Sequence, residues 1–353
     1  MFLKCCIFLT AFSLLTGIYA SDTPLKQLHI VFRHGERAPT ETYKNDPHIN
    51  FTWSGGWGQL TNRGKFEMYT LGLKLKEQYS GFIPDYYFPE DVKMRSSYAD
   101  RCLMSAEALL AALFPPRDQQ IWNENLLWQP IPIHYVPRSQ DNLIAMKSAC
   151  KKYDEELAQV LKSEKIQDII AANSDLLHYL TEHAGQKFDS IGSVELLYNT
   201  LEIELLHNLT LPAWTRNVSL EDMKILAARS LEIYTETDFM KKMKGGMFLK
   251  EVISSLERTD KSPFLYLYAA HDLTLVNILR ALGYKSMLKP GFGASLVFEM
   301  RNNSEVTMVY RDDFKSDPEQ IALENCRPPC LFDNFKTVLE PFIPSDWEAE
   351  CTQ

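Results

Sequence analysis

The chain has 353 residues, of which 45% are hydrophobic and 12% aromatic, so it can bury one large core or two closely joined ones. Its formal net charge of −9 makes nucleic acid and anionic membrane surfaces poor partners, because like charges repel. An anionic substrate would therefore need a local pocket of positive charge.

The first twenty residues have the pattern of a signal peptide. The basic residue Lys4 precedes an apolar run from Cys5 to Leu15, and Ala20 supplies a small residue for cleavage. The run is too short to span a bilayer, and no later segment is long and apolar enough to do so. We therefore expect a soluble, secreted protein with no membrane span.

Three later segments share one pattern, in which a short apolar strand is followed by a few polar residues and a helix. The strands are predicted at 28–32, 91–94 and 264–268, and the last of the three helices is expected to end at Leu282 with Gly283 as its cap. Strands of this kind favour an α/β fold with a mostly parallel central sheet flanked by helices. Ligands of such sheets lie beyond the carboxyl ends of the strands.

Between the second and third strands the chain is predicted to be mostly helical. The expected helices are 141–161, 164–180 and 221–234. The last of these follows a capping-box pattern at Ser219 and Asp222. We interpret 131–259 as a helical subdomain inserted into an α/β core made of 21–130 and 260–353. Near the end, 295–300 and 306–311 favour a hairpin, and an irregular cysteine-containing tail follows.

Cysteines and glycosylation sequons agree with export. Without the signal peptide five cysteines remain, at Cys102, Cys150, Cys326, Cys330 and Cys351. The odd number requires one thiol that is free or paired between chains, and Cys102, in an apolar helical stretch, is expected to be the buried free one. The others could form two disulfides; zinc is the competing hypothesis, which secretion and the lack of nearby histidines oppose. Four Asn-X-Ser/Thr sequons begin at Asn50, Asn208, Asn217 and Asn302.

The strongest motif directly follows the first strand. Arg33 and Arg37 can form forked hydrogen bonds to a phosphate group, and His34 between them can present a neutral imidazole nitrogen to phosphorus. Gly35 would allow backbone and ligand to approach closely. A surface loop with ordinary basic residues is the competing interpretation, which this spacing at a strand end makes much less favourable.

A second pair, His271-Asp272, follows the third strand. Asp272 could protonate a leaving alkoxide, and it could equally cap the following helix. His271 could bind a phosphate oxygen. Arg95 ends the second strand and is the third candidate, whereas Arg101, in the next helix, could bind phosphate or form a structural ion pair.

The sequence resembles the histidine acid phosphatases, a branch of the histidine phosphatase superfamily, over essentially the whole mature chain. The similarity includes the Arg-His-Gly-X-Arg-X-Pro signature at 33–39, Met94-Arg95-Ser96, Asp100-Arg101 with Met104-Ser105-Ala106, the stretches 112–116 and 209–214, Ala270-His271-Asp272, and the cysteine spacing.

This resemblance implies that His34 forms a phosphohistidine, that Asp272 donates the proton, and that no metal or other cofactor is required. It also implies that phosphate is held by Arg33, Arg37, Arg95 and His271. The implied disulfides are Cys150 with Cys351 and Cys326 with Cys330. Relatives are often homodimers.

Two departures from the family pattern concern structure and location. A further disulfide is missing, because the stretches near Ile203 and Gly293 contain no cysteine. The chain ends in polar residues at Gln353, without a C-terminal membrane segment, which favours release from the cell. The sequence thus predicts a secreted phosphatase acting on small or peptide phosphomonoesters. The alternative is a secreted binding or host-interaction protein on a phosphatase fold, with incidental catalysis.

Overall fold

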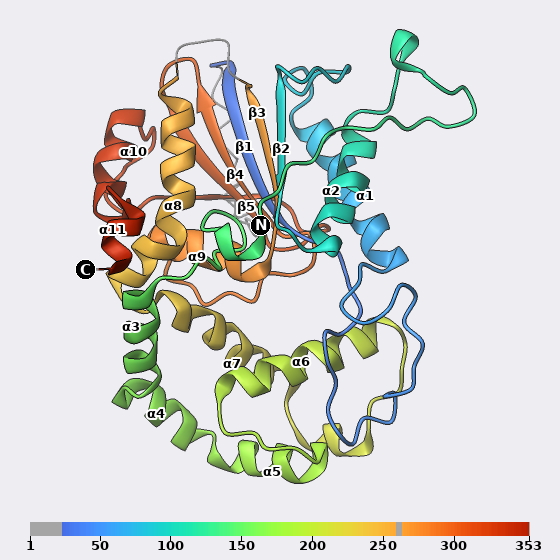
Figure 1. Cartoon of the computed structure of the whole chain (residues 1–353), viewed down its shortest axis with the longest axis vertical. Helices are drawn as coiled ribbons and strands as arrows, with labels where there is room; N and C mark the ends of the chain where they lie inside the picture. Colours follow the sequence, from blue (N-terminus) through green and yellow to red (C-terminus); the bar gives the residue numbers. More distant parts are fainter. Residues whose placement is uncertain (1–22, 259–262, 353) are drawn as a thin grey trace, which may run out of the picture.

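A computed structural model describes residues 23–258 and 263–352 of the chain. The predicted signal peptide, residues 1–20, lies outside the described residues. Within those two ranges six strands form one sheet (Figure 1). The strands are β1 (Leu25–Arg33), β2 (Val92–Ser96), β3 (Leu265–Ala270), β4 (Ser295–Arg301), β5 (Val306–Arg311) and β6 (Glu319–Ile321).

The helices precede, separate and follow these strands. They are α1 (Asn62–Gln78), α2 (Asp100–Leu113), α3 (Lys151–Leu161), α4 (Glu164–Ala172), α5 (Ser174–Ala184), α6 (Ile191–Leu206), α7 (Leu220–Glu232), α8 (Asp238–Leu256), α9 (Asp272–Ala281), α10 (Phe332–Leu339) and α11 (Trp347–Thr352).

The strand order is β2-β3-β1-β4-β5-β6. The first three strands in this order run parallel to one another, whereas β4 is antiparallel to β1 and is followed by the antiparallel strands β5 and β6. The prediction of an α/β fold with a parallel centre is therefore confirmed, and one side of the sheet is an antiparallel meander. The predicted hairpin is β4–β5.

Both faces of the sheet are buried under helices. On β1, the side chains of Leu28, Ile30 and Phe32 pack in one core with residues of α1 and α2, while Val31 belongs to a second core with α8, α9 and α10. Figure 1 shows these two groups of helices on opposite sides of the strands. This two-sided burial explains why the stretch 28–32 of the strand is apolar at every position except His29.

The parallel register brings three loops together at one edge of the sheet. Arg33 at the end of β1 lies opposite Ala270 at the end of β3, and Ser96 of β2 lies opposite Ala269. Backbone hydrogen bonds continue past the strands, because the His34 N–H donates to the Ala270 carbonyl at 3.0 Å. The residues that follow the three strands are therefore neighbours.

Two predicted helices differ from the structure. The helix expected over 141–161 begins only at Lys151, because the Asp141 carboxylate accepts the backbone N–H groups of Leu143, Ile144 and Ala145 and stabilises a turn instead. The helix expected over 164–180 is two helices, α4 and α5, which are separated at Asn173.

Other local expectations are met. Ser219 accepts the Asp222 N–H at the start of α7, and Gly283, with a φ of 82°, follows the end of α9 in the left-handed region. Cys102 is a buried free thiol, and the structure joins Cys150 to Cys351 and Cys326 to Cys330.

Helices α3 to α7 form an arc beyond the carboxyl edge of the sheet (Figure 1). They share a third apolar core with α11. Helix α8 belongs to both regions, since Met240 and Met243 pack in that core while Phe248 and Val252 pack against the sheet. The limits predicted for a separate helical subdomain, 131 and 259, stay a prediction.

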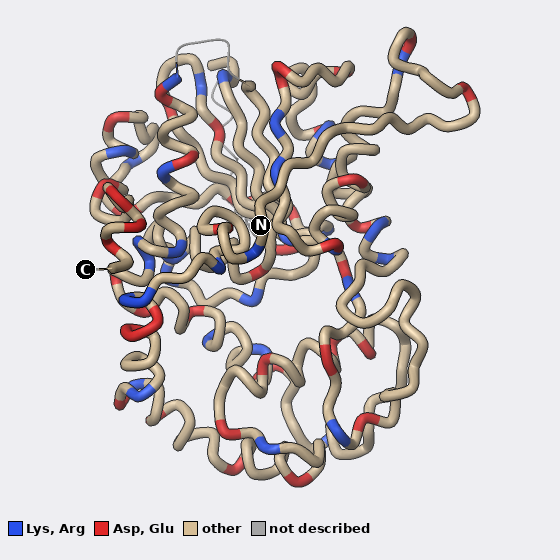
Figure 2. Tube along the Cα trace, in the orientation of Figure 1, with Lys and Arg blue, Asp and Glu red and all other residues tan. Residues whose placement is uncertain are grey.

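Charge is distributed over the whole trace. Among the described residues, Figure 2 shows Lys and Arg interspersed with Asp and Glu in both the sheet region and the helical arc. Because the charges are mixed in this way, any strongly positive site must be local.

None of the helices in the described part of the chain is long and apolar enough to cross a membrane.

Candidate active site

The loop after β1 is built around a close contact between two glycines. A Cβ on Gly35 would lie 2.3 Å from the carbonyl oxygen of Gly64, and a Cβ on Gly64 would lie 2.0 Å from the carbonyl oxygen of Glu36. Gly64 is in the first turn of α1, which Thr61 caps by accepting the Gly64 N–H. Gly35 is thus required for protein packing, not only for the approach of a ligand as the sequence suggested.

His34 is buried and its two ring nitrogens have different partners. Nδ1 lies 2.9 Å from the Gly35 carbonyl oxygen and must donate to it, because a carbonyl only accepts. Nε2 then carries the lone pair, and it accepts a hydrogen bond from Nε of Arg101 at 3.1 Å. The structure therefore presents Nε2 as the nucleophilic nitrogen, directed at a guanidinium group.

Three arginines surround this imidazole. Burial, followed by the charges of Arg101 and Arg33 and then those of His271 and Arg37, holds the pKa of His34 well below its usual value. The imidazole is therefore neutral at mildly acidic pH. Within the described residues, Nε of Arg33 and Nε of Arg37 are buried and have no hydrogen-bond acceptor, so they are able to donate to an anion.

His271 lies against His34 from the end of β3. The ring centroids are 5.6 Å apart and the rings meet edge to face. Nε2 of His271 is 2.8 Å from Oγ of Ser97, which follows β2. Burial and then the charge of Arg101 lower the pKa of His271 to about 3, so it too is neutral at acidic pH.

Asp272 is the first residue of α9 and His271 is the N-cap residue, so the alternative expectation of Asp272 as the helix cap is wrong. Its Oδ1 accepts the Leu273 N–H at 2.8 Å, and its Oδ2 lies 3.0 Å from Nη2 of Arg33. Oδ2 also lies 3.3 Å from Nζ of Lys289. The beginning of α9 adds the favourable dipole of a helix N-terminus for anions.

The expectation for Arg95 is corrected by the structure. Strand residues alternate between faces, so Arg95 lies opposite Tyr268 on the α8 face, and its Nη1 is 3.7 Å from Oε1 of Glu251 in α8. Arg101, which the sequence offered only as a second candidate, occupies the first turn of α2 and contacts His34. The structure therefore places Arg101, not Arg95, beside His34.

A cleft of about 960 Å³ opens in front of these residues. Arg101, His271 and Asp272 line its inner end, and residues of α3, α4, α6 and α7 line the rest. Arg138 and Lys147 add positive charge farther out. A molecule larger than phosphate can thus be accommodated next to the buried imidazole.

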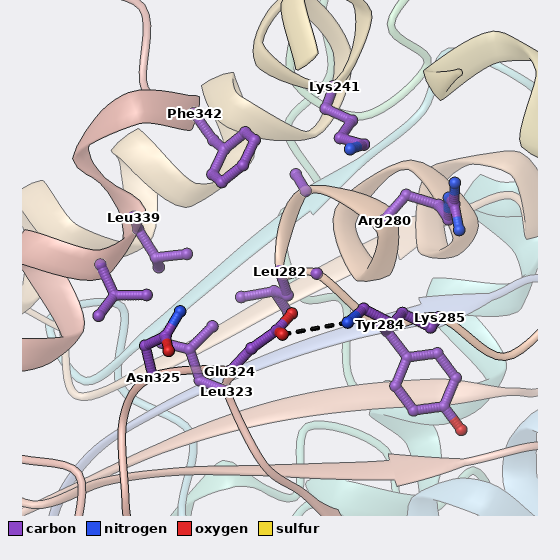
Figure 3. Close-up of a pocket in the computed structure, with 13 residues that line it drawn as sticks. Lys241, Arg280, Leu282, Tyr284, Lys285, Leu323, Glu324, Asn325, Leu339 and Phe342 are labelled. Carbon is purple, nitrogen blue, oxygen red and sulfur yellow. Dashed lines mark hydrogen bonds and ion pairs between the residues drawn. The ribbon is translucent and has the colours of Figure 1, made fainter. Parts of the chain in front are cut away.

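A second pocket, of about 370 Å³, lies between α9, α10 and the segment around Leu323 (Figure 3). Figure 3 shows Lys285 paired with Glu324 at its edge and Arg280 on the neighbouring helix. None of the predicted site residues lines it. It shares no lining residue with the cleft beside Arg101, His271 and Asp272.

Sequence reasoning missed several buried groups that support the site. Glu36, fully buried, accepts hydrogen bonds from Thr61 and from Nε2 of His207 in the segment after α6. The Glu36 N–H donates to Glu67 of α1. Lys289, beside Asp272, was also missed. The Asp100-Arg101 motif was a signal for Arg101, but nothing local in the sequence identified the others.

Across residues 23–258 and 263–352, no group of three or more His, Cys, Asp or Glu side chains is arranged to hold a metal ion.

Residues 24–311 match the family model described as "Histidine phosphatase superfamily (branch 2)". The chain is 34% identical over 357 residues to prostatic acid phosphatase of Homo sapiens, covering 98% of this chain and 92% of that protein. It is 32% identical over 338 residues to lysosomal acid phosphatase of Rattus norvegicus, covering 93% and 80%. A Hafnia alvei phytase in complex with tartrate has a similar fold, with a TM-score of 0.71, 18% identity and coverage of 93% and 98%.

Proposed function

This chain belongs to branch 2 of the histidine phosphatase superfamily and is a histidine acid phosphatase, and we propose that it is secreted and hydrolyses phosphate monoesters through a phosphohistidine at His34. The observation that supports this mechanism is the unprotonated Nε2 of His34, whose lone pair points at Arg101 among the cations Arg33, Arg37 and Arg101. A neutral nucleophile inside a cluster of cations suits an anionic phosphate.

The reaction has two steps. The Nε2 lone pair of His34 attacks phosphorus, the ester P–O bond breaks, and the leaving oxygen takes a proton from Asp272. Water then attacks the phosphohistidine and gives a proton to the Asp272 carboxylate, the P–N bond breaks, and inorganic phosphate is released. Positive charge from Arg33, Arg37 and Arg101, with hydrogen bonds from His271, would stabilise the transferring group.

A panel of phosphomonoesters assayed from mildly acidic to neutral pH tests the function. The expected result is hydrolysis that is strongest at acidic pH. If no ester in the panel, small or peptidic, were hydrolysed, the alternative of a secreted binding protein on this fold would be favoured instead.

Secretion is supported by three independent features. The signal peptide pattern is at the N-terminus, two disulfides join distant or looped segments, and all four sequon asparagines are exposed. These asparagines are Asn50, Asn208, Asn217 and Asn302. Their glycosylation and the homodimer expected from the resemblance stay predictions.

The two arginines Arg101 and Arg95 allow a matched test of the phosphate site, because only Arg101 lies beside His34. Arg101→Met is expected to lower kcat/KM for p-nitrophenyl phosphate by about 10²-fold, because it removes a donor beside the nucleophile. Arg95→Met should stay close to wild type, since Arg95 pairs with Glu251 on another face of the sheet. Steady-state kinetics of both variants show which arginine holds phosphate. A larger loss of kcat/KM in Arg95→Met than in Arg101→Met would support the expectation from the sequence that Arg95 does.

A further inference from the structure

Lys289 is a buried cation that the catalytic scheme does not use. It lies in the segment between α9 and β4, and its side chain is 2% exposed. Lysine is almost never buried to this extent without a partner. Its Nζ lies 3.3 Å from Oδ2 of Asp272, the oxygen that Arg33 also contacts. Lys289 is thus a direct neighbour of the proposed acid.

The segment that carries Lys289 is attached to the active site itself. Nη1 of Arg33 donates to the carbonyl of Pro290, and the Arg33 guanidinium lies 4.1 Å from the centre of the Phe292 ring. The Gly293 N–H donates to the His34 carbonyl at 3.3 Å. These contacts, made by the residues that directly follow Lys289, hold this part of the segment against the loop after β1 and thereby position Lys289 beside Asp272.

The contacts of Asp272 conflict with a simple role as a proton donor. Its carboxylate forms ion pairs with Arg33 and Lys289 and accepts a hydrogen bond from the Leu273 N–H. All three contacts favour the ionised form. Burial alone would raise the pKa of Asp272, but Arg33 and Lys289 hold it well below its usual range. A general acid must carry its proton when the leaving group departs.

The groups that face Asp272 come from several elements. They are Arg33, His34 and Arg37 from β1 and its loop, Cys102 from α2, Glu195 from α6, the adjacent His271, and Lys289. Glu195 is the other carboxylate, and burial raises its pKa while the charge of Lys289 opposes that rise. The charge of Lys289 therefore acts on both carboxylates, and its direct contact is with Asp272.

We propose that Lys289 is a positioning residue for Asp272, which fixes its carboxyl group and confines its action as an acid to low pH. This inference rests on the proposed function. A bound phosphate dianion draws Arg33 toward its own oxygens and favours protonation of the neighbouring carboxyl group. Lys289, which contacts the same Oδ2 atom and stays paired with it, opposes the protonation. The balance leaves Asp272 protonated with substrate only when the solution is acidic.

The test is the pH dependence of kcat for glycerol 2-phosphate, because kcat reports the ionisation of the enzyme with substrate bound. The alkoxide leaving group of this ester needs the acid. In Lys289→Met the loss of the cation lets Asp272 keep its proton to higher pH. The basic limb of the pH profile, where the rate falls as pH rises, should therefore shift to higher pH by about one unit. Lys289→Arg should keep the wild-type limb. The ionisation of the substrate is common to all variants and cancels in the comparison.

Two controls separate this role from a structural one. Lys285→Met removes an exposed lysine of the same segment, which pairs with Glu324, and should leave the profile unchanged. In an Asp272→Asn background, Lys289→Met should produce no shift, because the residue on which it acts is gone. A purely structural ion pair would lower the thermal unfolding temperature without moving the limb.

The inference is overturned if both Lys289→Met and a second variant, Lys289→Gln, fold and have the wild-type basic limb. An inactive wild-type enzyme would contradict the proposed function instead. In that case, carbon-13 NMR titration of the Asp272 carboxyl, whose signal is assigned by its loss in Asp272→Asn, still measures the effect of Lys289 on the titration midpoint. An unchanged titration midpoint in Lys289→Met would contradict the inference without reference to activity.

Discussion

Replacement of His34 by alanine is expected to lower turnover of every phosphate monoester by at least about 10⁴-fold, because it removes the atom that bonds to phosphorus. The surrounding arginines would still bind the substrate, so the loss should fall mainly on kcat. Since His34 is held neutral by burial and by Arg101 and Arg33, its protonation should limit the wild-type enzyme only well below the usual pKa of histidine.

The direct measurement is acid-quench trapping with a ³²P-labelled monoester. Wild type should give an acid-labile, base-stable protein label, and His34→Ala should give none. His178→Ala, which removes an exposed histidine of α5 far along the chain from the motif, is the matched control and should label like wild type. A label of normal intensity in His34→Ala would contradict the assignment of His34 as the nucleophile. Fast-quench sampling allows the label to be detected even if the intermediate breaks down rapidly.

The parts of the fold that could be predicted from the sequence are the strands whose side chains are buried on both faces of the sheet. In β1, Leu28, Ile30 and Phe32 pack in one core and Val31 in the other, so the stretch 28–32 is apolar on both faces with His29 as its one interruption. The same holds for β3, which is buried along its whole length. Parallel pairing of these strands then places His34 beside His271.

The errors in the helical region have a different cause. The stretch after Asp141 has helical periodicity, but the Asp141 carboxylate takes three backbone N–H groups that a helix would have used elsewhere. Asn173 likewise interrupts a continuous helical pattern between α4 and α5. Short polar side chains compete with helices in this way, and the outcome depends on contacts that periodicity does not show.

The candidate site was predictable where its residues immediately follow strands. Arg33 is the last residue of β1, and His34 and His271 directly follow β1 and β3, so the register alone brings them together. The prediction for Arg95 was wrong because it assumed that any arginine at a strand end faces the site. Side chains of a strand alternate between its faces, and Arg95 faces α8. Lys289 is 17 residues from Asp272 in the chain and reaches it only through the fold.

The acid role of Asp272 leads to the second large effect. Asp272→Asn keeps the size and shape of the side chain, and its remaining oxygen can still accept a hydrogen bond, but it cannot supply the proton. We expect a loss of about 10³-fold for an alkyl phosphate such as glycerol 2-phosphate, whose leaving group needs protonation. For p-nitrophenyl phosphate, whose leaving group departs as a stable anion, the loss should be less than about tenfold. The ratio of the two losses is the measured quantity.

The pH dependence of the same variant gives an independent check with a defined sign. Because Arg33 and Lys289 hold the pKa of Asp272 well below its usual range despite burial, the wild-type rate on the alkyl ester should fall as pH rises and the acid loses its proton. Asparagine does not titrate, so this fall should disappear from the profile of Asp272→Asn. Equal losses on both esters, or a basic limb that persists in the variant, would mean that Asp272 acts only through its contacts with Arg33 and the start of α9. The proton would then have to come from another group of the cleft, and the buried carboxyl of Glu195 is the residue whose replacement should be measured next.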